Sequence, residues 1–340
     1  MNAFGTPVDE LRGPARSPAE ISRFVVEAAV QAPSVHNSQP WWFSTSGREI
    51  SLHADLDRRL NIADPRGREM MISCGAALFT ARLALRYLGL VPKVRLLPDP
   101  DLPNLIARIG YGDEPVAPAE YECGLFAEIT RRHTHRGGFD HEPLPASMIA
   151  ILREEAVREN AALAIMADEA KRGALGAAVE AAEYALQLDA MRSREQAKWA
   201  PPPGSSRRDG VPVTAYPARP ERTQPSFPAR DFAHGRGWGT PPSGGQPVPR
   251  SAGLVTVLTT QSDGPADWVS AGQALQRVLL AASSCDLKAA LHSQPLEIDE
   301  LREFVSAVLC DGGYAQMVIR LGCTGQTSAS VRRTVEEVLL

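Results

Sequence analysis

The chain has 340 residues, of which 36 are basic and 40 acidic, so its formal net charge is −4 at pH 7. This charge excludes a strongly basic protein that binds nucleic acid or an anionic membrane through a general positive field. The apolar runs at residues 70–77 and 278–282 are much shorter than the ~20 residues that span a bilayer. Residues 1–16 lack the pattern of a secretory signal, so we expect a cytoplasmic protein with no nucleic-acid or membrane partner.

The first part of the chain predicts two helices followed by a strand. Ser17-Pro18-Ala19-Glu20 combines an N-cap, a first-turn proline and a capping-box acid, and apolar residues follow at helical spacing to about Gln31. Residues 70–88 predict a helix that is apolar on nearly every side and ends at Gly89. The apolar residues of 105–109 alternate as in a strand. The second helix should therefore lie in the core.

The second part of the chain repeats this order of elements. A helix opens at Pro145-Ala146, much as the first helix opens at its own proline. Two further matches follow in the same order. The first aligns Gly75-Ala76-Ala77-Leu78 without gaps with Gly272-Gln273-Ala274-Leu275, and the second matches Arg108-Ile109-Gly110 to Arg320-Leu321-Gly322. Matches this short also arise by chance between alanine-rich helices, but three in the same order favour two related halves.

An insertion distinguishes the second half, which spans 121–340, from the first, which spans 1–120. The first two matches lie about 70 residues further apart in the second half. The added residues predict a long helix over about 168–199 and a Pro/Gly-rich stretch over about 200–250, which holds 12 of the 28 prolines. Aromatic residues such as Phe227 favour a lid that packs on the protein over a disordered linker.

Two segments carry the polar side chains of a binding site. Arg131-Arg132-His133-Thr134-His135-Arg136 gathers several potential cations and a hydroxyl, which suits a phosphate. A solvated basic turn explains this segment equally well, and zinc binding by its histidines is disfavoured because the arginines would repel the metal. The second segment, 32–41, is a proline-flanked loop of hydroxyls and amides that could bond the polar edge of a flat heterocycle.

These segments resemble the FMN-binding motifs of the nitroreductase family. Residues 33–41 resemble the P-S-x-x-N-x-Q-P-W loop that lies against the flavin ring, and residues 131–136 resemble the R-R-x-S-x-R segment that holds the phosphate. Gln294-Pro295-Leu296-Glu297 resembles the P-x-E segment whose backbone approaches the flavin N5, and Arg332-Arg333 resembles the closing segment that returns to the phosphate. The resemblance implies cofactor binding by Pro33, Ser34, Val35, Asn37, Arg131, Arg132, Thr134, Arg136, Pro295, Leu296, Glu297, Arg332 and Arg333, and no catalytic side chain.

The distribution of these motifs implies a single-chain pseudo-dimer. Ordinary members are homodimers in which one subunit supplies the phosphate arginines and the P-x-E segment, and the other lends the flavin-ring loop. Here the loop occurs only in the first half and the other motifs only in the second. With the long insertion, this pattern resembles the Acg-type branch and implies an α+β nitroreductase-like fold with one flavin site. Departures are His36 in place of a smaller residue, Thr134 in place of serine, and an extra glycine after Arg136.

The resemblance implies two functions that differ in access to the flavin. The first is an FMN-dependent oxidoreductase, with NAD(P)H as a transient reductant and a nitro, quinone-like or other unsaturated small molecule as acceptor. The alternative is an FMN-holding protein whose insertion closes over the ring and permits little or no turnover. Because a pseudo-dimer completes its own site, we expect a monomer.

Overall fold

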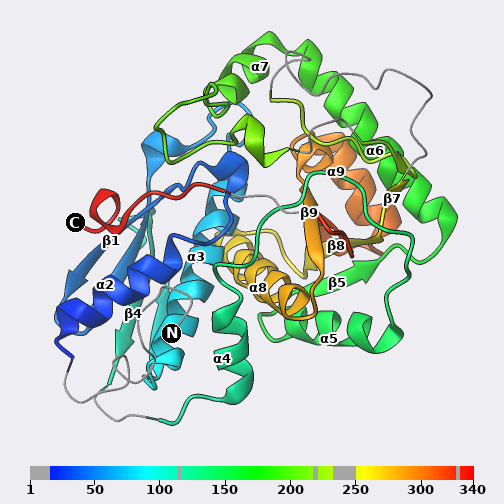
Figure 1. Cartoon of the computed structure of the whole chain (residues 1–340). Coiled ribbons are helices and arrows are strands. Elements are labelled where there is room, and N and C mark those ends of the chain that lie inside the picture. Colours follow the sequence, from blue (N-terminus) through cyan, green and yellow to red (C-terminus); the bar gives the residue numbers. More distant parts are fainter. Residues whose placement is uncertain (1–15, 113–115, 217–220, 233–249, 327–329) are drawn as a thin grey trace.

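The computed structural model describes residues 16–112, 116–216, 221–232, 250–326 and 330–340 (Figure 1). The expected insertion falls partly outside these ranges, because 217–220 and 233–249 are not described. The described chain forms two four-stranded antiparallel sheets with helices between and around them, and a two-stranded parallel sheet of β6 (Thr223–Gln224) and β7 (Arg250–Ser251). The fold is therefore a mixed helix and sheet fold.

The first half contains one sheet and two main helices. Helix α2 begins with the predicted capping box, since the Ser17 hydroxyl and the Glu20 carboxylate each bond the other residue's backbone amide. The buried helix predicted over 70–88 is confirmed as α3, which is buried along nearly its whole length. The elements are α2 (Pro18–Ala29), β1 (Trp41–Ser46), β2 (Glu49–Ala54), α3 (Arg68–Tyr87), β3 (Pro92–Leu96) and β4 (Leu105–Tyr111), with short 3-10 turns at Val35–Asn37 and Leu56–Arg58.

Helix α4 (Glu120–Ala127) lies at the boundary expected between the two halves. The helix expected at Pro145 is confirmed as α5. The main elements are α5 (Ala146–Val157), β5 (Ala162–Ile165), β8 (Leu254–Thr260), α8 (Pro265–Ser284), β9 (Lys288–His292), α9 (Asp299–Phe304) and β10 (Tyr314–Gly322). Short helical turns lie at η4 (Gln294–Leu296), η5 (Val305–Leu309) and η6 (Val335–Glu337).

The two sheets have the same strand order relative to the chain. The first sheet runs β1-β2-β4-β3 and the second runs β5-β8-β10-β9. In each, the first two strands are neighbours, and the long helix α3 or α8 follows the second strand. Strands β1 and β2 are joined by a tight turn at Gly47, whose φ is +56°. Strands β5 and β8 are instead joined by residues 166–253, which include the expected insertion.

Helices α3 and α8 lie side by side between the sheets (Figure 1) and make the most extensive contact between any two described elements. They approach at Gly75 and Gly272, the two glycines that the sequence repeat aligns. A Cβ on Gly75 would lie 2.2 Å from the carbonyl oxygen of Val269, and one on Gly272 would lie 2.0 Å from that of Ile72. Any larger residue would therefore push the helices apart. Apolar side chains of both halves share one continuous core around this contact.

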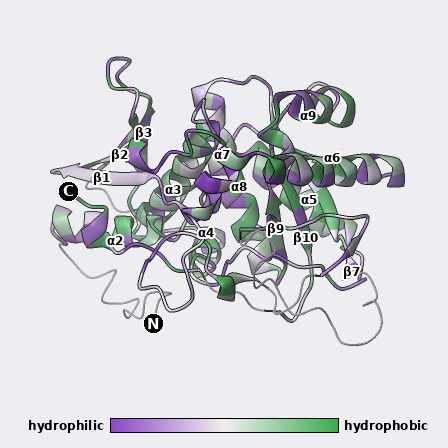
Figure 2. Cartoon of the chain, turned by 90° about the horizontal axis from the view of Figure 1, so that it is seen from above, coloured by the Kyte–Doolittle hydropathy of each residue, from purple (hydrophilic) through white to green (hydrophobic). Residues whose placement is uncertain are grey.

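The long helix predicted over about 168–199 is divided into two helices in the structure. Helix α6 (Glu169–Leu188) ends at Asp189 and α7 (Ala190–Ala197) begins there. The Asp189 backbone is extended, and its side chain accepts hydrogen bonds from the amides of Met191 and Arg192. This N-cap competes with helix continuation, which explains the break. In Figure 2, α6 carries both hydrophobic and hydrophilic residues, as expected for a helix with one buried face.

The C-terminal segment returns to the first half (Figure 1). The Phe43 amide donates to the Val338 carbonyl at 2.6 Å, and the Leu340 amide donates to the Phe43 carbonyl at 2.8 Å. The last residues of the chain therefore lie beside β1. This crossing brings Arg332 and Arg333 next to the loop that follows α2.

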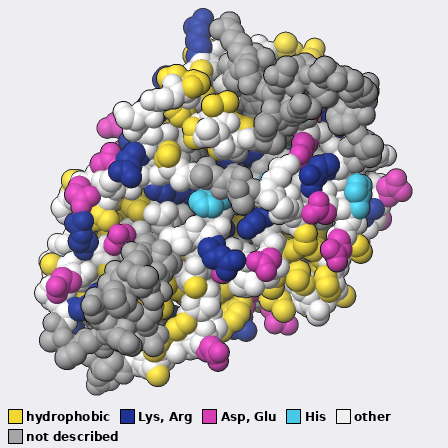
Figure 3. All heavy atoms as spheres, in the orientation of Figure 1, with side chains coloured by type: hydrophobic (Ala, Val, Ile, Leu, Met, Phe, Trp, Pro, Cys, Tyr) yellow, Lys and Arg dark blue, Asp and Glu magenta, His cyan; other side chains and the backbone are white. Residues whose placement is uncertain are grey.

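Among the described helices, none is long and apolar enough to cross a membrane. The described part of the chain also contains no group of three or more His, Cys, Asp or Glu side chains placed to hold a metal ion. On the face shown in Figure 3, basic and acidic side chains are intermixed over the described surface.

Candidate functional site

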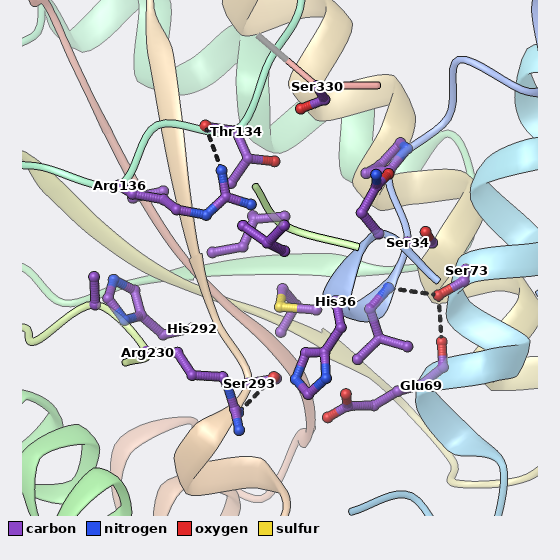
Figure 4. A pocket seen from close by; sticks show the side chains of 18 of the residues that line it. Ser34, His36, Glu69, Ser73, Thr134, Arg136, Arg230, His292, Ser293 and Ser330 are labelled. Carbon is purple, nitrogen blue, oxygen red and sulfur yellow. Dashed lines mark hydrogen bonds between the residues drawn. The ribbon is translucent and has the colours of Figure 1, made fainter. Parts of the chain in front are cut away.

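A cavity with about 1000 Å³ of space between atoms, part of it open to solvent, is lined by residues of both halves. The loop at 33–37 and the first turns of α3 form one side. Residues 134–136, the end of β9 and the middle of β10 form much of the rest, and the insertion and the C-terminal segment complete it (Figure 4). Segments far apart in the sequence thus meet at one site.

The loop after α2 is fixed by hydrogen bonds within itself and to α3. The Ser34 hydroxyl accepts from the Gln39 amide at 2.9 Å. The Val35 amide donates to the Ser73 hydroxyl at 3.1 Å, and that hydroxyl donates to the Glu69 carbonyl at 2.7 Å. These bonds hold the loop on the N-terminal part of α3 and set the direction of its side chains.

The backbone of this loop is strained in a way that side chains rarely tolerate. His36, Asn37 and Gln39 have φ values of 49°, 53° and 50°. Such left-handed conformations cost free energy and are concentrated at functional sites. The His36 ring is 8% exposed, lies edge-on to Phe232 at a centroid distance of 4.9 Å, and has no hydrogen-bond partner among the described residues. Burial and nearby arginines lower the pKa of His36 well below its usual value, so the ring is neutral.

Four arginine side chains gather around the cavity without a carboxylate partner. Arg320 and Arg132 are buried, and Arg136 and Arg332 are half-buried. Their hydrogen bonds go to carbonyl oxygens and a histidine, and no described carboxylate forms an ion pair with them. Burial, with the neighbouring arginines adding to it, lowers the pKa of Arg132 to about 10 and that of Arg332 to about 9. A cluster of this kind is stabilised when an anion enters.

Arg320 is held in place from every side within the second sheet. It donates to Nε2 of His292 at 2.9 Å and to two backbone carbonyls. Its guanidinium carbon lies 5.4 Å and 5.3 Å from the ring centroids of Phe139 and Phe227. Burial lowers the pKa of Arg320 to about 9. The side chain is thus a fixed positive charge on the cavity wall.

A second group of charges lies at the part of the cavity that includes Glu69 (Figure 4). Glu297, whose side chain is 1% exposed, forms an ion pair with Arg230 of the insertion. Arg230 also donates to the Ser293 hydroxyl at 3.3 Å, and this hydroxyl donates to Glu297 at 2.8 Å. The insertion is therefore anchored to the turn that follows β9 by a buried ion pair.

Several buried polar atoms at the cavity have no hydrogen-bond partner among the described residues. They include both ring nitrogens of His36, one carboxylate oxygen of Glu69, the side-chain oxygen of Gln294 and Nε of Arg332. Buried polar groups are normally satisfied, so each of these atoms points to a missing partner. Together with the unpaired guanidiniums, they fit a ligand with a dianionic group and a polar ring edge.

The structure brings together seven of the thirteen residues assigned from the resemblance. Pro33, Ser34, Val35, Asn37, Thr134, Arg136 and Arg332 line the cavity. Arg132 is buried behind them and donates to the Gln31 carbonyl at 3.3 Å.

The other five residues lie outside the cavity wall. Arg131 is exposed and pairs with Glu128 at 2.8 Å. Pro295 and Leu296 form η4, and the Glu297 side chain turns toward Arg230. Arg333 binds the backbone carbonyls of Gln39 and Trp41 at 3.3 and 3.2 Å. Ser293 and Gln294, which directly precede Pro295, do line the cavity.

Sequence reasoning missed several residues of the site. Glu69, Ser73, Arg230, His292 and Arg320 line the cavity but belong to none of the binding motifs noted in the sequence. A signal for one of them was present: Arg320 is a charged residue next to the apolar run Met317-Val318-Ile319. A buried charge of this kind is rare unless it is paired or functional.

Relatives with a known name cover nearly the whole chain. The Mycobacterium tuberculosis protein named "Putative NAD(P)H nitroreductase Rv3131" is 34% identical over 305 residues, covering 89% of this chain and 85% of its own length. The M. tuberculosis protein named "Putative NAD(P)H nitroreductase acg" is 27% identical over 323 residues, covering 94% and 95%. No family model matches the chain.

Similar solved structures are more distant. A nitroreductase with bound FMN from Desulfitobacterium hafniense is 15% identical, with a TM-score of 0.40, covering 63% of this chain and 96% of its own. A second, from Bacteroides fragilis, is 12% identical with a TM-score of 0.36, covering 62% and 93%. The family of the chain is defined by its sequence relatives and not by these distant structures. The chain belongs to the nitroreductase family, in the branch that includes the Acg-like proteins.

Proposed function

We propose that the chain binds one FMN in this cavity and acts as an oxidoreductase, using NAD(P)H to reduce a nitro, quinone-like or other unsaturated small molecule. The observation that carries the proposal is the group of four guanidiniums, Arg132, Arg136, Arg320 and Arg332, without a carboxylate partner in the described chain. A phosphate supplies the missing negative charge. The names of the relatives, NAD(P)H nitroreductases, agree with this reaction class.

The residues divide the binding task by their chemistry. Arg132, Arg136 and Arg332, with the Thr134 hydroxyl, would hold the phosphate, while Ser34 and Asn37 would bond the ring edge. FMN, when bound, supplies reversible two-electron chemistry. Each charge-assisted hydrogen bond contributes roughly 1.5–3 kcal/mol, so three supply much of the ~8 kcal/mol that corresponds to micromolar binding. Arg320 adds a fixed positive charge deeper in the wall.

Two matched variants test the phosphate site. Arg136→Ala removes a cavity-lining guanidinium and should weaken FMN binding by roughly 10- to 100-fold, measured by titration of the flavin absorbance. Arg131→Ala removes a neighbouring arginine that is paired with Glu128 outside the cavity, so FMN affinity should stay within a few-fold of wild type. Equal affinities for Arg136→Ala and wild type would contradict the assignment.

The proposal includes an arrangement of the chain as its own pseudo-dimer, with halves at 1–120 and 121–340. Two observations support it: the two sheets have the same strand order, and the contact at Gly75 and Gly272 is reciprocal. In each direction the glycine meets the carbonyl three residues before the other glycine, as at a two-fold axis. Sedimentation should give a monomer that binds one FMN. Two FMN per chain, or an obligate dimer, would contradict this arrangement.

A second candidate function is favoured by the position of the insertion. Val211, Ala229, Arg230 and Phe232 line the cavity, and Arg230 is ion-paired with Glu297. An insertion that acts as a closed lid would hold FMN and exclude nicotinamide. Anaerobic mixing of the FMN complex with NADH or NADPH separates the two functions. Prompt bleaching with turnover supports the reductase, whereas bleaching by dithionite alone supports the flavin holder.

A further inference from the structure

Glu69 is a buried carboxyl on the cavity wall that FMN binding as proposed above does not use. It lies in the first turn of α3 and is 3% exposed. One carboxyl oxygen accepts from Arg68 at 3.1 Å, and the other has no hydrogen-bond partner among the described residues. In Figure 4 the carboxyl lies in the same part of the cavity as His36 and Ser293. It is therefore placed to bond a molecule in the cavity.

Glu69 has one positive partner, which it shares with other groups: the Arg68 guanidinium lies 3.1 Å from its carboxyl. Asp64 and Glu297 are the nearby acids, and Arg68 and Arg230 are the nearby bases. Arg230 is bound to Glu297, and Arg68 also donates to the backbone carbonyl of Gln316 at 2.9 Å. Asp64, Glu69 and Glu297 are thus three acids beside two guanidiniums, so one negative charge would be uncompensated if all three were ionised.

The groups just outside this set do not change the balance. Arg302 is paired with Asp263, and Arg192 lies 3.5 Å from Asp189 and 3.8 Å from Glu297. Burial, and then the charge of Glu297, raises the pKa of the Glu69 carboxyl well above its usual value, with Arg68 opposing them. The carboxyl thus keeps its proton to a higher pH than an exposed glutamate does, and a protonated carboxyl can donate its hydrogen.

The proposed reaction requires one proton that the reductant does not supply. Reduction of a quinone by NAD(P)H consumes one quinone, one NAD(P)H and one proton, and yields hydroquinone and NAD(P)⁺. Both electrons and one hydrogen come from NAD(P)H. The remaining proton must reach a quinone oxygen inside the cavity.

We infer that Glu69 is the proton donor to the acceptor bound in the cavity, an inference that rests on the proposed function. The O–H bond of the Glu69 carboxyl breaks as an O–H bond forms on the quinone oxygen, and the carboxylate takes a new proton from solvent. Two other titratable groups fit the role less well. His36 is held neutral, and Asp64 is occupied in accepting from the Met70 amide at 2.9 Å and does not line the cavity.

The test compares Glu69→Gln with Glu155→Gln, which changes an equally buried glutamate that does not line the cavity. Infrared spectra of the ligand-free proteins at neutral pH report the C=O band of a protonated carboxyl. This band should be present in wild type and Glu155→Gln and missing from Glu69→Gln. With 1,4-naphthoquinone as acceptor, Glu69→Gln should slow reduction by about 10²-fold. Glu69→Asp, which keeps an acid, should restore part of the rate.

The pH profile and FMN affinity complete the test. The wild-type rate should fall as pH rises through the raised pKa of Glu69, and this decline should be absent from Glu69→Gln. Two outcomes would overturn the role of Glu69 and leave the proposed function standing. One is an infrared band that is unchanged in Glu69→Gln; the other is a Glu69→Gln pH profile and rate equal to wild type while FMN binds normally. If the wild-type chain fails to bind FMN, the proposed function fails and the inference fails with it.

Discussion

The guanidinium of Arg332 donates a hydrogen bond of 2.8 Å to the side-chain carbonyl of Asn37. Asn37 belongs to the strained loop after α2, and Arg332 to the C-terminal segment that returns from the second half. The side-chain amide nitrogen of Asn37, Nδ2, in turn donates to the backbone carbonyls of Gly210 at 2.8 Å and Val331 at 3.1 Å. One side chain therefore joins the flavin-ring loop, the insertion and the C-terminal segment at the cavity.

Replacing the Asn37 side chain with alanine should lower the free energy of unfolding by more than the left-handed backbone of residue 37 accounts for. Asn37→Ala loses three hydrogen bonds of about 1 kcal/mol each and places alanine at a φ of 53°. Asn160→Ala is the matched control, because Asn160 has a φ of 58° but is exposed and has no side-chain bond among the described residues. Urea unfolding should give a loss of about 1–2 kcal/mol for Asn160→Ala and about 2–3 kcal/mol more for Asn37→Ala. Equal losses would show that the three bonds contribute nothing.

Adding even one methyl group at the contact between α3 and α8 should destabilise the protein. Gly272→Ala would place a Cβ 2.0 Å from the Ile72 carbonyl, and a backbone carbonyl in a packed helix cannot move aside. We expect a loss of about 3 kcal/mol or more in the free energy of unfolding.

Gly173→Ala in α6 provides the control, since nothing lies within 4 Å of its added Cβ. The same substitution there should stabilise the helix by about 0.5–1 kcal/mol. Thermal unfolding of both variants measures the contrast. A stable Gly272→Ala variant would mean that the helices do not approach closely at this glycine.

Removing only one partner of the ion pair between Arg230 and Glu297 should lower the stability of the protein. Arg230→Gln leaves the Glu297 carboxylate buried without its main partner and should lose about 3–5 kcal/mol of stability. Adding Glu297→Gln removes that charge, so the double variant should recover much of the loss. Additive losses in the double-mutant cycle would contradict coupling between the insertion and the turn after β9.

The stability of the protein should depend on pH through Glu69. Because its pKa is raised in the folded state, the protonated carboxyl stabilises the fold most fully below the unfolded pKa of ~4.3, and this contribution is lost as pH rises through the folded pKa.

Glu69→Gln cannot lose a proton, so its stability relative to wild type should rise with pH over that window. The slope should approach about 1.4 kcal/mol per pH unit. Urea unfolding of both proteins at several pH values measures it. A stability difference independent of pH would show that Glu69 titrates alike in the folded and unfolded chains.

Local patterns in the sequence predict much of the fold. The capping box at Ser17 and the apolar character of 70–88 locate α2 and α3 because capping and burial are encoded within one helix. The sequence repeat aligns Gly75 with Gly272, but the contact that the two helices make at these glycines was not predicted from it. The break at Asp189 was not predicted, because it depends on a single side chain bonding two amides.

The site could be predicted only where its residues are consecutive. The loop containing Ser34 and Asn37 and the segment containing Thr134 and Arg136 are local motifs, and both line the cavity. Arg320 reaches the cavity because the strands β8, β9 and β10 pair in one register, which no local pattern encodes. The ion pair between Glu297 and Arg230 likewise depends on a distant residue of the insertion.

The most direct test of the account is to titrate the purified wild-type chain with FMN and, separately, with riboflavin, following the shift of the flavin absorbance. The two ligands share the ring and differ in the phosphate, so their affinities isolate what the arginines around the cavity contribute. We predict one FMN per chain, bound about 10²-fold or more tightly than riboflavin. No binding of FMN, or equal binding of both flavins, would contradict a flavin phosphate held by Arg132, Arg136 and Arg332.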